Sequence, residues 1–84
     1  MVVGIVEKTD SFVKFVKKVK DPVFREKIQK QIVKIVENPE IGKPMMYARK
    51  NTREIYISPF RLSYCYIKEE NKIIFMDLYH KDLQ

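Results

Sequence analysis

The chain has 84 residues, enough for one hydrophobic core and too few for a second, so we predict a single domain over residues 1–84. Apolar residues make up 45% of the sequence and charged residues 33%, which excludes a disordered chain and is typical of a folded globular domain. With one cysteine, Cys65, and one histidine, His80, the chain can form neither an internal disulfide nor a Cys/His zinc site.

The net charge of +6 and the pI near 9.5 favour polyanionic partners, because clustered lysine and arginine side chains release the counterions condensed on nucleic acid. The same field would attract an acidic protein, and a lysine-rich surface also serves solubility alone. No apolar run reaches the roughly 20 residues that cross a bilayer, and the N-terminus lacks the pattern of a secretory signal. We therefore expect a cytoplasmic protein with no membrane contact.

The N-terminal half is predicted to hold one short strand and two helices. Residues 1–6 are apolar and β-branched, as in a strand, and residues 9–11 then offer three helix N-caps. Residues 12–19 place apolar side chains at helical spacing, with lysines largely on the opposite side. A second helix begins at Asp21-Pro22, because Asp caps a helix and Pro suits its first position, and it stops at Asn38 before a proline. The tight connection makes the two helices antiparallel.

The C-terminal half is predicted to be β-structure. Isoleucine, tyrosine and phenylalanine are enriched in three segments, residues 52–57, 60–68 and 72–79. Ser58-Pro59 and Glu70-Asn71 suit the turns between them, which gives an antiparallel meander. The order β-α-α-β-β-β predicts an α+β domain in which two antiparallel N-terminal helices pack on one face of an antiparallel sheet. The other face stays open, as a platform for a ligand.

Register arithmetic then brings side chains of different strands together. If the last turn has two residues, Arg61 stands opposite His80. The preceding turn sets Tyr56 opposite Arg61 and puts Glu54 on the same face. A one-residue bulge would bring Arg53 there instead. The predicted cluster is therefore Glu54, Tyr56, Arg61 and His80.

These residue types suit the cleavage of RNA without a metal ion. The reaction needs a base for the 2′-hydroxyl proton, cations for the pentacoordinate phosphorane, and an acid for the leaving 5′-oxygen. Arg61 suits the phosphorane because its planar guanidinium donates two hydrogen bonds to phosphate and stays ionised. A histidine such as His80 can act as acid or base. Glu54 and Tyr56 complete the candidate set.

Structural roles compete with this interpretation. Arg61 can bridge Glu54 or Asp77 without any catalytic part. His80 can be an ordinary, partly exposed strand residue, and the strand tyrosines can pack the sheet rather than stack on bases. Cys65 is expected to pack as a small apolar side chain.

Three short motifs carry a resemblance to a known family. They are the loop Glu37-Asn-Pro-Glu-Ile-Gly-Lys-Pro44, the strand segment Phe60-Arg-Leu-Ser-Tyr64, and the terminal strand ending in Tyr79-His80. In this order, and over nearly the whole chain, they resemble the RelE/ParE toxin superfamily, and the RelE-like toxins in particular. The abundance of lysine, isoleucine and glutamate also fits an archaeal or thermophilic protein.

The resemblance implies the toxin of a type II toxin–antitoxin system. RelE-like members are ribosome-dependent endoribonucleases that cut mRNA and inhibit translation, and a RelB-like antitoxin neutralises them. The partners implied here are therefore an antitoxin, the ribosome and mRNA, and no cofactor is implied. The family arginine maps to Arg61, and the C-terminal histidine of one branch maps to His80.

The chain departs from the family pattern where cations are expected. The two positions facing Arg61 hold Glu54 and Tyr56 instead of basic residues, and Met45 replaces an acidic residue of one branch. Glu54 would then act as base, and Lys81 would stand in for a C-terminal catalytic residue. Four basic residues are expected to hold RNA phosphates: Lys43, Arg49, Lys50 and Arg53.

Two other functions remain open from the sequence. A ParE-like module would poison DNA gyrase by protein contact, without nuclease activity, and Arg61 and His80 would then be incidental. A plain nucleic-acid-binding domain without toxicity is supported by the charge alone.

Overall fold

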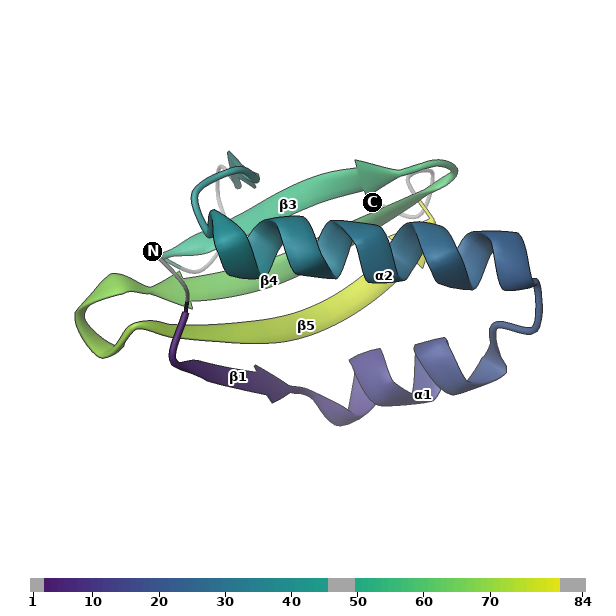
Figure 1. Ribbon diagram of the computed structural model, residues 1–84, viewed down its shortest axis with the longest axis horizontal. Coiled ribbons are helices and arrows are strands. Elements are labelled where there is room, and N and C mark those ends of the chain that lie inside the picture. Colours follow the sequence, from purple (N-terminus) through teal and green to yellow (C-terminus); the bar gives the residue numbers. More distant parts are fainter. Residues whose placement is uncertain (1–2, 46–49, 81–84) are drawn as a thin grey trace.

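The computed structural model describes residues 3–45 and 50–80, and it has two helices beside one five-stranded sheet (Figure 1). The elements are, in chain order, β1 (Ile5–Lys8), α1 (Asp10–Lys18), α2 (Pro22–Glu37), β2 (Lys43–Pro44), β3 (Thr52–Ile57), β4 (Phe60–Ile67), a 3₁₀ turn (Lys68–Glu70) and β5 (Lys72–His80). The sheet order is β1-β5-β4-β3-β2, with β1 parallel to β5 and all other pairs antiparallel. This confirms the predicted α+β class.

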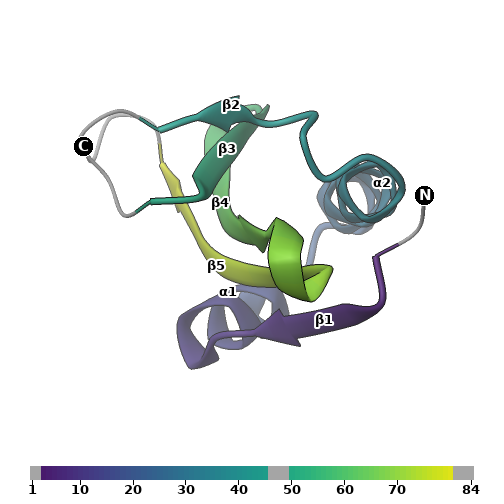
Figure 2. The same ribbon diagram turned by 90° about the vertical axis from the view of Figure 1, so that its left-hand side faces the viewer.

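Both helices lie on the same face of the sheet and run antiparallel, and the sheet curves around α2 (Figures 1 and 2). No described helix lies over the other face. None of the helices in the described ranges is both long and apolar enough to span a bilayer.

The helix starts follow the capping residues. The Thr9 hydroxyl accepts a hydrogen bond from the backbone N–H of Phe12 at 3.2 Å, so α1 begins at Asp10. The Asp21 carboxylate accepts from the N–H of Val23 at 3.0 Å, and Pro22 takes the first position of α2. The local sequence therefore sets both helix starts before any packing is considered.

The core fills the space between the helices and the sheet. Its buried apolar side chains come from both helices, from β3, β4 and β5, and from the residue Val3 ahead of β1: Val3, Phe12, Ile28, Ile35, Ile57, Leu62, Tyr64, Ile73, Phe75 and Leu78. Phe12 stacks on Phe75 with ring centroids 5.5 Å apart, which joins α1 to β5. Cys65 is buried, as the sequence predicts for a small apolar side chain.

The register of β5 against β4 differs from the prediction. The connecting turn has four residues, 68–71, because the 3₁₀ turn precedes Asn71, which takes the left-handed conformation with φ 51°. A register shift between Ser63 and Tyr64 then leaves Met76 as an extra residue in β5. A four-residue turn alone would keep His80 on the side of Arg61, but the one-residue bulge reverses the faces beyond it.

Thr9 ties this bulge to the start of α1. Its hydroxyl donates to the carbonyl of Met76, and its backbone N–H donates to the carbonyl of Phe75 at 3.0 Å. The same hydroxyl oxygen caps α1 through Phe12. One threonine thus satisfies a helix terminus and the irregular part of a strand.

Tyr64 anchors the loop that follows α2. Its ring is fully buried, and its hydroxyl accepts from the N–H of Gly42 at 2.8 Å and donates to the carbonyl of Pro39 at 2.7 Å. A Cβ at position 42 would overlap that hydroxyl and lie 2.8 Å from a ring carbon, so only glycine fits. The Gly-Lys-Pro part of the loop motif is therefore shaped by packing on Tyr64.

Replacing Tyr64 with Phe is expected to lower the free energy of unfolding by about 1–3 kcal/mol, because the Gly42 donor and the Pro39 acceptor lose their buried partner.

Burial raises the pKa of Tyr64 above its ordinary value of 10.0, so the fold favours the neutral phenol. That stabilisation is complete below pH about 10 and is lost as the pH rises through the raised pKa. Thermal melts from pH 7 to 11 should show a smaller alkaline loss in Tyr64→Phe than in the wild type, and an equal loss would contradict this account.

Candidate functional site

A row of three side chains crosses the open face of the sheet. Tyr56 of β3 pairs with Arg61 of β4, and Arg61 pairs with Tyr79 of β5, so all three project from the same face. Glu54 lies two residues before Tyr56 in β3 and projects from the same face. Arg61 Nη1 donates to Glu54 Oε1 at 3.1 Å, and the Tyr79 hydroxyl donates to Glu54 Oε2 at 3.1 Å. Both carboxylate oxygens are thereby held in place.

The carboxylate and the guanidinium are partly shielded from water. The Glu54 side chain is 18% exposed and that of Arg61 is 33% exposed, so their ion pair is weakened less by salt than a fully exposed pair. Lys43 of β2 stands opposite Glu54 across the strand pair. A cavity of about 230 Å³ is lined by these three residues together with Ile55 and Tyr56.

The residues of this cavity can bind an anion and accept a proton at the same place. The Glu54 carboxylate can accept a proton, while Arg61 and Lys43 can hold an anion in the same cavity. Tyr56 is 51% exposed, and its hydroxyl lies 3.4 Å from Ser58 Oγ. An incoming phosphate would have to share Arg61 with Glu54, so the cavity suits a substrate that also engages the carboxylate.

The prediction that Arg61 faces His80 is wrong. His80 pairs with Phe60, on the helix-covered face, and the two rings meet edge to face with centroids 5.5 Å apart. Phe60 also contacts Phe15 and Phe24 of the helices. The bulge at Met76 puts Tyr79, rather than His80, beside Arg61. Whether His80 acts as acid or base stays a prediction, and this geometry does not favour it.

Tyr79 is the residue that the sequence interpretation missed. A regular hairpin places it on the face opposite Arg61, whereas the structure places it on the same face, bonded to Glu54. Asn71 tolerates the left-handed conformation and signals the longer turn, but that turn alone leaves Tyr79 on the other face of the sheet from Arg61. The bulge itself has no clear sequence signal.

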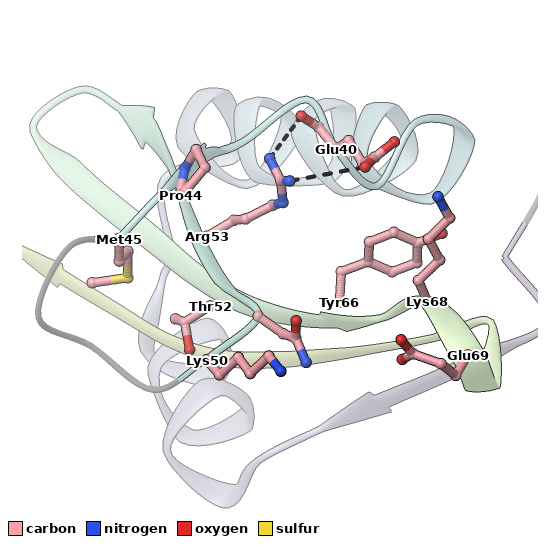
Figure 3. Close-up of a pocket in the computed structure, with 10 residues that line it drawn as sticks. Glu40, Pro44, Met45, Lys50, Thr52, Arg53, Tyr66, Lys68 and Glu69 are labelled. Carbon is pink, nitrogen blue, oxygen red and sulfur yellow. Dashed lines mark hydrogen bonds and ion pairs between the residues drawn. The ribbon is translucent and has the colours of Figure 1, made fainter.

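The predicted phosphate-binding residues do not form one group. Lys43 is exposed and lines the cavity with Arg61. Arg53 lies on the opposite face of β3, where its Nη1 donates to the carbonyls of Glu40 at 3.0 Å and Gly42 at 2.7 Å. Its Nη2 lies 4.0 Å from the Glu40 carboxylate. Figure 3 shows the guanidinium of Arg53 turned toward Glu40. Arg53 thus holds the loop after α2.

Lys50 is exposed and lines a second cavity at the start of β3. The remaining two predicted basic residues, Arg49 and Lys81, lie outside the described residues. The bulge alternative, in which Arg53 replaces Glu54 beside Arg61, does not occur, because β3 and β4 pair in the predicted register.

The sequence comparison decides the family. Residues 6–82 match the family described as the ParE toxin of the type II toxin–antitoxin system parDE. The chain belongs to the ParE toxin family. A search of curated protein sequences gives no significant match.

Solved structures show how widely the fold of this ParE-family toxin is shared. The intact E. coli RelBE toxin–antitoxin complex contains a chain with 20% identity and a TM-score of 0.77, covering 90% of this chain and 94% of its own. The YoeB/ParE toxin from Agrobacterium tumefaciens has 15% identity and a TM-score of 0.79, with coverages of 92% and 98%. The archaeal RelE–RelB complex of Pyrococcus horikoshii OT3 gives 10% identity, a TM-score of 0.74, and coverages of 94% and 96%. These structures share the fold of the chain, and the family match over residues 6–82 confirms the resemblance to the RelE/ParE superfamily.

The contact between Glu54 and Tyr79 can be measured as a coupling energy. In a double-mutant cycle, Glu54→Ala and Tyr79→Phe should show a coupling of about 1 kcal/mol in unfolding free energy, because they share one hydrogen bond. Glu54→Ala and His80→Ala form the control pair and should be additive within about 0.3 kcal/mol, because the side chains lie on opposite faces. Coupling to His80 and none to Tyr79 would contradict the register.

Proposed function

We propose that this ParE-family toxin is an endoribonuclease that cuts mRNA on the ribosome without a metal ion and so inhibits translation. The observation that carries the proposal is the pairing of Glu54 with Arg61 inside one cavity on the open face. A proton acceptor and a phosphate-binding cation are two of the three groups that the cleavage step needs, and Tyr56 at the same cavity supplies the third, the acid. The net charge of +6 favours a polyanionic substrate.

The proposed step balances without a cofactor. Glu54 takes the proton of the 2′-hydroxyl, and the 2′-oxygen attacks the adjacent phosphorus. Arg61 leaves the carboxylate to donate to the phosphorane oxygens. The bond from phosphorus to the 5′-oxygen breaks, and Tyr56 protonates that oxygen. The products carry a 2′,3′-cyclic phosphate and a 5′-hydroxyl.

The other residues assist rather than react. Tyr79 orients the Glu54 carboxylate through its hydrogen bond. Lys43 holds an adjoining phosphate at the cavity, and Lys50 binds a further phosphate of the RNA before β3 begins. Arg49 as a phosphate-binding residue and Lys81 as a catalytic residue stay predictions from the resemblance. Arg53 contributes by fixing the loop that carries Lys43, rather than by touching phosphate.

A RelB-like antitoxin is the proposed inhibitor. The E. coli and Pyrococcus horikoshii structures with this fold are complexes of RelE with RelB. An antitoxin segment that covers the Arg61 cavity would block RNA from the site, and its acidic side chains would complement the basic domain. Toxin, antitoxin and ribosome would meet in the cytoplasm.

Gyrase poisoning is the second candidate function. The family match to ParE favours it, and so does Glu54, which neutralises Arg61 where RelE-like toxins are expected to carry cations. In this case the Arg61 cavity has no catalytic role.

Induced expression with primer-extension mapping of mRNA 5′ ends separates the two candidates. The wild type should stop growth and produce cuts at fixed positions within codons. Glu54→Gln should lower cleavage about 10²- to 10⁴-fold, because it removes the base while keeping the side-chain shape. His80→Ala is the matched control and should retain cleavage, because His80 lies on the other face.

Growth arrest without mRNA cuts would contradict the ribonuclease proposal. If Arg61→Ala then remains toxic and purified toxin inhibits DNA supercoiling by gyrase, the second candidate is correct. Cleavage that survives Glu54→Gln but disappears in His80→Ala would overturn the assigned base.

A further inference from the structure

A second cavity, of about 380 Å³, lies beyond the C-terminal end of α2, where β3 begins and β4 ends. Its volume falls in the range of sites that hold small ligands, roughly 300–1,000 Å³. The walls include Tyr66, Lys68 and Glu69 from the end of β4 and its turn, and Lys50 and Asn51 from the start of β3. Neither the proposed cleavage step nor the core packing uses this cavity.

An aromatic ring forms one wall. Tyr66 is partly buried and packs against the core, so its ring is held in a fixed orientation. Figure 3 shows this ring between Glu40 on one side and Glu69 on the other. Bases of single-stranded RNA stack on such rings, and their edges are then read by nearby polar groups.

The polar groups around the ring are of two kinds. Lys50 and Lys68 supply cations for a phosphate, while Glu40 and Glu69 supply carboxylates that accept hydrogen bonds. Arg53 also lines the cavity, but its guanidinium is bonded to the loop after α2. A carboxylate accepts two parallel hydrogen bonds from the adjacent N1–H and N2–H groups of guanine, which no other standard base offers.

The two cavities lie on opposite faces of the sheet, on either side of its β2 edge. In β2, Lys43 pairs with Glu54 and lines the Arg61 cavity, whereas Pro44 pairs with Arg53 and lines the second cavity. Because β2 has two residues and lies at the sheet edge, an RNA strand can pass over it.

We propose that the second cavity binds one nucleobase of single-stranded RNA, preferentially guanine, next to the nucleotide held at Arg61. Tyr66 stacks on the base, a carboxylate reads its edge, and Lys50 and Lys68 hold its phosphate. The proposal rests on the proposed function for the choice of RNA, but binding is measured without cleavage.

The test is an NMR titration of the ¹⁵N-labelled full chain with GMP, AMP, CMP, UMP and ribose 5-phosphate. GMP should shift the amide signals of Asn51, Tyr66, Lys68 and Glu69, with at least about fivefold tighter binding than the other nucleotides. Ribose 5-phosphate should shift them least. Equal shifts from ribose 5-phosphate, or shifts confined to the Arg61 cavity, would overturn the proposal.

Matched variants identify the contacts. Tyr66→Phe should keep GMP affinity, whereas Tyr66→Ala should lower it at least about fivefold through lost stacking. Lys68→Gln should weaken binding, and Lys30→Gln on α2 should not, although both remove one charge. Thermal melts establish that each variant is folded.

Two further outcomes are informative. If Tyr66→Ala weakens antitoxin binding but leaves GMP affinity unchanged, the cavity docks protein and the proposal is wrong. If no mRNA is cut in cells but GMP binds here as described, the cleavage proposal fails while the base-binding cavity stands.

Discussion

The extra residue Met76 in β5 is the constraint on which the open face depends. Before Met76 the odd-numbered residues Ile73 and Phe75 point into the core, and after it the even-numbered Leu78 does. This reversal turns Tyr79 toward Glu54 and turns His80 toward the helices. The bulge is held by Thr9, whose hydroxyl also caps α1, so the start of a helix and the composition of the site are set by one side chain.

The other edge of the site depends on the loop after α2. Tyr64 bonds the loop from inside the core, and Arg53 bonds it from the sheet. These contacts let the short strand β2 pair with β3, which sets Lys43 opposite Glu54. The position of the exposed Lys43 therefore depends on the loop contacts of Tyr64 and Arg53, and on Gly42, where no side chain fits.

Much of the fold follows from local sequence, because caps, prolines and apolar spacing act within a few residues. The two helices, the three long strands and the β3–β4 register are predicted correctly, and so is the cluster of Glu54, Tyr56 and Arg61 on one face. The β4–β5 register is not, because it depends on a four-residue turn and a bulge that is held by Thr9, distant in sequence. The partnership of Tyr79 with Glu54 was missed for this reason. The loop-holding role of Arg53 was missed because it depends on how the loop after α2 brings two backbone carbonyls to the guanidinium.

The most direct test of the central claim is the set of cross-strand nuclear Overhauser effects between β4 and β5. The account predicts contacts that link Arg61 with Tyr79 and Phe60 with His80, and a break in the regular pattern at Met76. Contacts that link Arg61 with His80, in an unbroken ladder, would contradict it. The site would then contain the histidine and lose the tyrosine that holds Glu54.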